Sequence, residues 1–159
     1  MKRSTVLLIL LVLILVGVST QQGQTQAAQQ VFVLTLKGPL TPAMVGYLER
    51  GLTSAENEAA EALIVQLDTP GGSIDLMNRM VQAIRASRVP VIVYVAPRGA
   101  IAGSAGTVIT LAGHIAAMAP ETAIGAASPV GGQGEELGET IAAKEKEILK
   151  ATVRSLAEG

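Results

Sequence analysis

Short apolar runs alternate with amphipathic stretches along most of the chain. Three runs, Val31–Leu36, Ala62–Leu67 and Val89–Ala96, are rich in β-branched residues, and glycine and proline punctuate the sequence around them, which predicts strands. The continuous apolar character of Ala62–Leu67 is typical of a strand that is buried on both faces of a parallel sheet.

Helices are predicted between these strands and after them. Thr41 and Pro42 fit an N-cap followed by proline at the first helical position. A second helix shows apolar residues at helical spacing and ends near Ser87, Ser104 opens a third, and Glu139–Leu156 forms the last. Weaker patterns predict strands at Ile115–Pro120 and Thr122–Ala127 and a polar loop at Gly131–Gly138. Repeated strand-helix units predict an α/β fold with a parallel sheet and right-handed crossovers.

The first residues have the features of an export signal. Met1–Arg3 is basic, and Val6–Val18 is an apolar run of the length of a signal-peptide core, shorter than the about 20 residues that a spanning helix needs. Cleavage at Gly17–Ser19 or Thr25–Ala27 and retention as an uncleaved anchor both stay open. We expect residues 1–28 to be a signal peptide or signal anchor, and 29–159 to be one domain outside the cytoplasm, exported or membrane-anchored.

Composition excludes several classes of function. The net charge is −1 and the chain holds one Phe, two Tyr and no Trp, so it lacks both the basic patch and the stacking platforms of nucleic-acid binders. Cysteine is absent, which excludes disulfides, thiolate metal sites and a cysteine nucleophile. We expect no cofactor, no metal and no nucleic-acid partner.

Two glycine-rich breaks follow predicted strands and lead into helices. They are Pro70–Gly72 and Gly99–Gly106. Ligands of parallel sheets bind beyond the carboxyl ends of the strands, where backbone N–H groups and helix N-termini converge. Pro70–Gly72 taken alone favours an ordinary tight turn. The second break, in register with it, favours an oxyanion hole beside Ser104.

Ser104 needs a base to act as a nucleophile. His114, the single histidine, falls about 15 Å away along a continuous helix, which favours a helix C-terminal role for it. An α/β-hydrolase elbow would need a later histidine, and the sequence has none. A lysine remains, and it works only if desolvation lowers its pKa. Lys144 falls on the side of Ile141 and Ile148, although Glu145 also lies near that side.

The other lysines of the last predicted helix fit a solvated basic face. Lys146, Lys150 and Arg154 follow one another at spacings of four, a pattern typical of exposed side chains. Lys144 is therefore the predicted base, and Lys146 remains the alternative.

Several segments resemble one known family. LDTPGGSID at Leu67–Asp75, VPVIVYVAPRGAIAGSAGT at Val89–Thr107, HIAAMAPETAIGAASPV at His114–Val130 and the ending VRSLAEG are similar to the NfeD (nodulation formation efficiency D) membrane-bound serine proteases. The resemblance implies a Clp protease/crotonase-like spiral of ββα units with a mostly parallel sheet. It implies Ser104 and Lys144 as a catalytic dyad and the N–H groups of Gly72 and Ala105 as the oxyanion hole.

The resemblance also carries expectations about partners and extent. It implies cleavage of hydrophobic segments of membrane-associated proteins, a stomatin-like membrane partner and a homodimer. Because the family's protease domain continues with further helices, the chain is expected to be a C-terminally truncated form of that domain. Two alternatives stay open: an inactive scaffold that holds a membrane partner, and a crotonase-type enzyme that binds a CoA thioester.

Overall fold

The computed structural model describes residues 30–125, 127 and 138–158. The predicted leader at 1–28 and most of the predicted loop Gly131–Gly138 lie outside the described residues. The elements, in chain order, are β1 (Val31–Lys37), α2 (Pro42–Asn57), β2 (Ala62–Asp68), α3 (Ile74–Ala86), β3 (Val91–Val95), β4 (Ile101–Gly103), α4 (Ala105–Ala112), β5 (Ile115–Met118), β6 (Ala123–Gly125) and α5 (Glu139–Glu158).

The main sheet has four parallel strands in the order β1-β2-β3-β5, and it confirms the predicted parallel α/β class. The predicted cap at Thr41 is present, since its side chain accepts a hydrogen bond from the Met44 N–H at 3.2 Å. Ser73, which was not predicted as a cap, caps α3 in the same way. A capping hydroxyl satisfies one of the free N–H groups of the first helical turn. The caps therefore fix where α2 and α3 begin after the strand ends.

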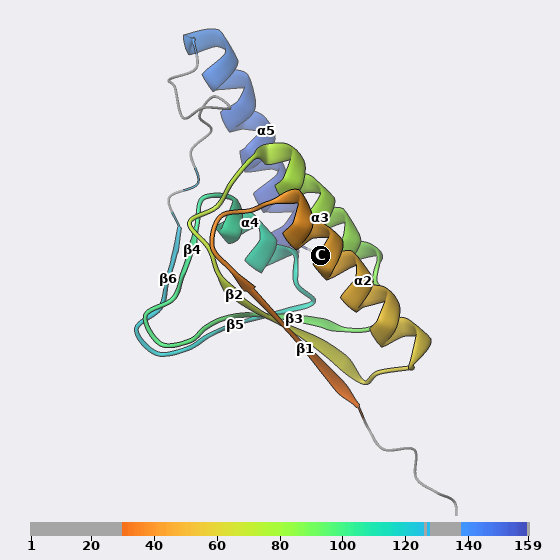
Figure 1. Cartoon of the computed structure of the whole chain (residues 1–159). Coiled ribbons are helices and arrows are strands. Elements are labelled where there is room, and N and C mark those ends of the chain that lie inside the picture. The colour runs from red at the N-terminus through yellow and green to blue at the C-terminus, as the bar shows by residue number, and fades with distance from the viewer. Residues whose placement is uncertain (1–29, 126, 128–137, 159) are drawn as a thin grey trace, which may run out of the picture.

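One face of the main sheet carries the core. Its inward side chains are fully or almost fully buried under α2, α3 and α4, which lie on that face (Figure 1): Leu34, Leu36, Leu63, Val65, Leu67, Val91, Val93 and Val95. The other face presents a row of β-branched residues in register, Val33, Ile64, Ile92 and Ile115. Ile64 is half-buried and Val33 exposed, so the expectation that Ala62–Leu67 is buried on both faces is correct for one face only.

A second, two-stranded parallel sheet pairs β4 with β6. The sequence pattern did not predict β4, because Ile101–Gly103 is only three residues long and too short to show an alternation. Thr69, directly after β2, forms an isolated parallel bridge with Ala102 of β4. The chain therefore leaves the main sheet at Thr69 and joins the edge of the second sheet there.

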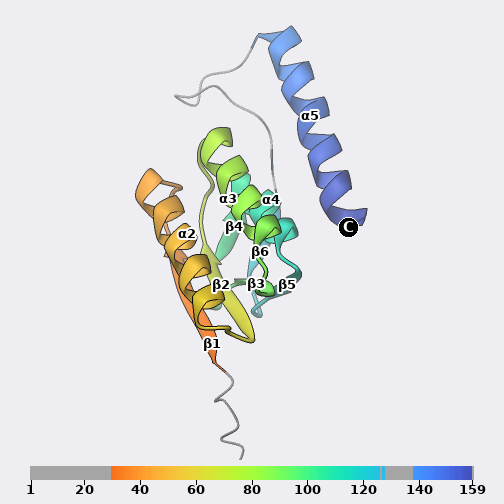
Figure 2. The ribbon, with the colours of Figure 1, turned by 90° about the vertical axis from the view of Figure 1, so that its right-hand side faces the viewer.

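The helices form one layer in the order α2, α3, α4 and α5 (Figure 2). α5 packs against α4 through Leu149, Val153 and Leu156, each partly buried, while Ile141 and Ile148 stay exposed. Within the described part of the chain, no helix combines the length and apolar character needed to cross a bilayer.

Candidate active site

Ser104 sits on a strained turn between β4 and α4. Its backbone has φ 50° and ψ −118°, a left-handed conformation that costs a non-glycine residue on the order of 1–3 kcal/mol. The Ser104 N–H donates to the carbonyl of Gly125 in β6 at 3.2 Å, so the pairing of β4 with β6 holds the turn. Although Ser104 precedes α4, its hydroxyl makes no capping hydrogen bond. The hydroxyl is therefore available to a ligand.

The turn after β2 lies against Ser104. Gly71 has φ 107°, and a Cβ placed on it would be 2.8 Å from the Ser104 Cβ and 2.9 Å from the Gly103 carbonyl oxygen. Only a residue without a side chain allows this approach of two backbones. The Gly71 carbonyl accepts a hydrogen bond from the Leu40 N–H at 2.9 Å. Since peptide C=O and N–H point in opposite directions, this bond turns the Gly72 N–H away from Leu40.

Two backbone donors remain without acceptors beside the serine. Among the described residues, neither the Gly72 N–H nor the Ala105 N–H donates to any protein group. Ala105 is the first residue of α4, so the partial positive charge at the N-terminus of that helix favours an anion beside the Ala105 N–H. The two N–H groups have the chemistry needed to bind a developing oxyanion.

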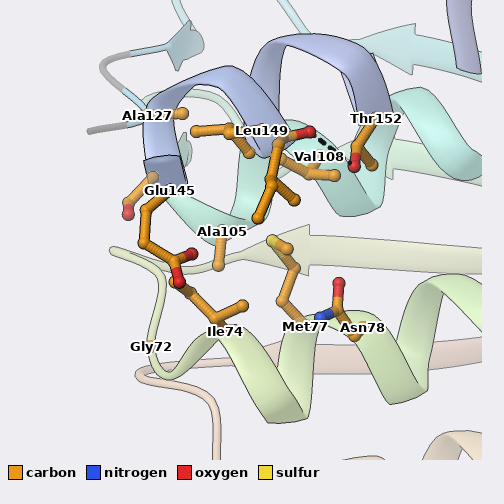
Figure 3. A pocket seen from close by; sticks show the side chains of 12 residues that line it. Gly72, Ile74, Met77, Asn78, Ala105, Val108, Ala127, Glu145, Leu149 and Thr152 are labelled. Atoms are coloured by element: carbon orange, nitrogen blue, oxygen red, sulfur yellow. Dashed lines mark hydrogen bonds between the residues drawn. The ribbon is translucent and has the colours of Figure 1, made fainter. Parts of the chain in front are cut away.

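Ser104, Gly72 and Ala105 line a common cavity of about 60 Å³. Most of its other lining side chains are apolar. All but Ala127, which follows β6, come from α3, α4 and α5 (Figure 3): Ile74, Met77, Val108, Ile148 and Leu149, with polar Asn78, Glu145 and Thr152. The cavity therefore joins a hydroxyl and two N–H donors to an apolar wall.

The predicted base is not at this cavity. Lys144 is exposed and does not line it, and Lys146 is exposed as well. Glu145 lines the cavity instead, with its carboxylate reaching toward Ile74 in Figure 3. The physical reason is the orientation of α5: Leu149 packs inward, and Glu145 lies one turn before it on the same face, whereas Lys144 is turned by about 100°.

His114 lies away from the cavity. α4 ends at Ala112, so His114 follows the helix and does not form its last turn, which corrects the helix C-terminal interpretation. Its Nδ1 accepts a hydrogen bond from the Val91 N–H at 3.1 Å, at the start of β3. Strand starts and strand ends lie at opposite edges of a parallel sheet, and the cavity is at the edge of the strand ends.

Two residues that the sequence reasoning did not single out brace the site. The Asp68 carboxylate accepts a hydrogen bond from the Ile101 N–H at 3.1 Å, and the Thr69 hydroxyl accepts one from the Gly71 N–H at 3.0 Å. A polar Asp-Thr pair at the end of an apolar strand is the sequence signal that marks such residues. Arg98, before β4, pairs with Glu121, before β6, and the Arg98 guanidinium lowers the pKa of the Glu121 carboxyl; neither residue lines the cavity.

The fold and the site define a Clp protease-like α/β protein. ClpP1 from Listeria monocytogenes superimposes with a TM-score of 0.67 at 16% identity, over 78% of this chain and 71% of that one, which shows the shared fold. This confirms the predicted fold class.

Residues 30–158 match the family described as NfeD1b, N-terminal domain, and the chain belongs to that family. Membrane-bound protease PH1510 of Pyrococcus horikoshii is 45% identical over 130 residues, which are 80% of this chain and 29% of that protein. Membrane protein NfeD1b of Bacillus subtilis is 35% identical over 106 residues, 67% of this chain and 24% of that protein. The chain thus spans less than a third of these curated relatives.

Solved structures agree with this assignment. The 1510-N membrane-bound stomatin-specific protease of P. horikoshii, a lysine-to-alanine mutant in complex with a substrate peptide, has a TM-score of 0.73 at 43% identity, over 80% of this chain and 59% of that one. A serine-to-alanine mutant of the same protease gives 0.72 at 42% identity, over 80% and 62%. The predicted family is therefore confirmed.

Proposed function

We propose that the domain is a serine endopeptidase with Ser104 as its nucleophile. One observation carries the proposal. Ser104 has a strained backbone and a hydroxyl that makes no capping hydrogen bond, and it lines the same cavity as Gly72 and Ala105, whose N–H groups have no acceptor among the described residues. The membrane-bound protease and the stomatin-specific protease named above support it, because both are similar to this chain over 80% of its length.

In this reaction the Ser104 Oγ attacks the scissile carbonyl carbon, and its proton passes to the base. The carbonyl oxygen becomes an oxyanion, which the Gly72 and Ala105 N–H groups bind. The base then returns the proton to the leaving amine as the C–N bond breaks, and water hydrolyses the acyl ester on Ser104 by the same steps. Aligned N–H donors need no reorganisation during this charge development.

We assign the base to Lys144, with Lys146 as the alternative. In the relative, the positions of the serine and lysine that were mutated are 41 apart, and here Lys144 and Lys146 follow Ser104 by 40 and 42. Both spacings differ by one residue from that of the relative, which supports a lysine of α5 as the base. Because Glu145 now lines the cavity, delivery of the Lys144 amine requires α5 to turn by about 100° about its axis.

The apolar wall beside Ser104 supports hydrophobic peptide segments as substrates. The relative that is named stomatin-specific supports a stomatin-like membrane protein as the partner. We further propose that the domain acts as a homodimer outside the cytoplasm, exported or anchored through residues 1–28.

A second candidate is an inactive scaffold for a stomatin-like membrane protein. The position of Glu145 favours it, since a carboxylate in the cavity and an exposed Lys144 leave Ser104 without a base in this arrangement.

A fluorophosphonate probe and labelled casein separate the two candidates. For the protease we expect labelling and cleavage by the whole chain, loss of both in Ser104→Ala, and loss of casein cleavage in Lys144→Ala. Lys150→Ala is the matched control, because Lys150 pairs with Glu147 on the exposed side of α5. A folded chain that neither reacts nor cleaves would overturn the proposal in favour of the scaffold, and full activity in Lys144→Ala would reject that base.

A further inference from the structure

Thr69 is a polar residue with no exposed surface in the centre of the domain. Among the described residues, only Thr69 and Thr110 are polar and fully or almost fully buried. A buried hydroxyl is retained at little cost only if it is hydrogen-bonded. Thr69 lies between the end of β2 and Pro70–Gly72, and it contacts both the loop that contains Gly72 and strand β4, which leads to Ser104.

The backbone of Thr69 holds the strand that leads to the serine. Its N–H donates to the Ile101 carbonyl at 2.7 Å, and its carbonyl accepts from the Gly103 N–H at 2.9 Å. These two bonds flank the bridge to Ala102 and leave no freedom of register between Thr69 and β4. Ser104 follows directly, so its backbone is placed relative to Thr69.

The side chain of Thr69 holds the loop that supplies the other donor. Its Oγ1 accepts from the buried Gly71 N–H at 3.0 Å, which fixes the peptide before Gly71. The Leu40 N–H fixes the next peptide through the Gly71 carbonyl, as described above. On the opposite side, the Thr69 Cγ2 lies where a Cβ on Gly106 would approach to 2.7 Å, so the methyl packs on the first turn of α4.

We infer that Thr69 is the positioning residue of the oxyanion hole, because one side chain sets the spacing between the Gly72 N–H on its loop and the Ala105 N–H on α4. The inference rests on the proposed protease function. The hydroxyl touches neither substrate nor the reacting atoms, and it acts through the Gly71 peptide. Oxyanion stabilisation depends on donors held at hydrogen-bond distance from where the charge develops, so a small displacement lowers the rate of the chemical step.

Thr69→Val keeps the shape and removes the acceptor. A methyl group then replaces the oxygen 3.0 Å from the Gly71 nitrogen, and the Gly71 N–H loses its partner. We expect kcat for labelled casein to fall by about 10-fold to 100-fold with KM changed by less than about 2-fold. Thr69→Ser keeps the acceptor, and we expect it to restore kcat to within about 3-fold of the wild type.

Thr110→Val is the matched control. Thr110 is equally buried and its hydroxyl donates to the Gly106 carbonyl at 2.8 Å, but it has no bond to the Gly71 loop. We expect this variant to keep wild-type kcat and the wild-type rate of reaction with the fluorophosphonate probe, whose phosphoryl oxygen occupies the same hole. Thr69→Val should react about 10-fold to 100-fold more slowly with the probe.

The outcomes separate the two levels of the proposal. Equal kcat in Thr69→Val and Thr110→Val, while Ser104→Ala is inactive, overturns the role of Thr69 and leaves the protease function standing. If Ser104→Ala cleaves casein as the wild type does, the protease assignment fails and this inference fails with it. If the valine variant does not fold, Thr69→Ala and Thr69→Ser carry the comparison, since both lack the methyl and differ in the hydroxyl.

Discussion

Replacing Gly71 with alanine tests the close approach of the two backbones beside Ser104. The added methyl meets the Ser104 Cβ at 2.8 Å and the Gly103 carbonyl oxygen at 2.9 Å, and neither atom belongs to a flexible side-chain end. The residue must also keep φ 107°, which an alanine rarely adopts. The substitution therefore adds crowding to backbone strain.

A control substitution separates the backbone strain from the crowding. A positive φ costs an alanine about 1–2 kcal/mol, and forcing an extra methyl into a packed site costs about 1–3 kcal/mol. We expect Gly71→Ala to lower the free energy of unfolding by about 2–5 kcal/mol. Gly99→Ala is the control, because Gly99 has φ 82° and a methyl added there would meet nothing within 4 Å, so about 1–2 kcal/mol is expected.

Urea unfolding of the whole chain, followed by far-ultraviolet circular dichroism, measures both variants. The difference between them, about 1–3 kcal/mol, is the crowding contribution. Only Gly71→Ala should also slow the reaction of Ser104 with the fluorophosphonate probe. Equal destabilisation by the two alanines, with normal labelling in both, would show that the Gly71 loop does not contact the serine turn as described.

Three further results are expected. Ser104→Gly should unfold with about 1 kcal/mol more free energy than Ser104→Ala, because glycine accepts φ 50°, and equal stability in denaturant would contradict the strain. Hydrogen bonds from the Arg88 N–H and, to a smaller extent, from its guanidinium lower the pKa of the Glu56 carboxyl, so the stabilisation they give is present above the ordinary carboxyl pKa and is lost as the pH falls through the lowered pKa. The free energy of unfolding of the wild type should therefore exceed that of Glu56→Gln by more at pH 7 than at about pH 3. A difference that does not change with pH would contradict this coupling. Lys144→Ala should retain below about 1% of kcat for casein, and turnover near that of the wild type would be incompatible with Lys144 as the base.

The main sheet and the first helices were predictable because the signals are local. Apolar runs bounded by turn residues specify strands, and Thr41–Pro42 specifies a helix start. β4 was not predictable, because its three residues become a strand only through pairing with β6, some twenty residues further along the chain. The length of α4 was overestimated for a different reason: Gly113, which caps the C-terminus of the helix, is a local stop signal that a continuous helix to His114 disregards.

The candidate site was predictable in its residue types and less so in its geometry. The glycine-rich breaks correctly brought Gly72, Ser104 and Ala105 to one cavity. Helical periodicity did not separate Lys144 from Glu145, because both lie within about 100° of the same apolar stripe and packing against α4 decides between them. The role of Thr69 depends on a contact between two sheets, which no single stretch of sequence encodes.

The bond from the Ser104 N–H to the Gly125 carbonyl has a consequence for the order of biosynthesis. A nascent chain that ends before residue 125 lacks the acceptor of this bond, so its serine turn is held only by the bonds between Thr69 and β4. The turn that carries the proposed nucleophile is therefore complete only after β6 has paired with β4, late in the synthesis of the domain.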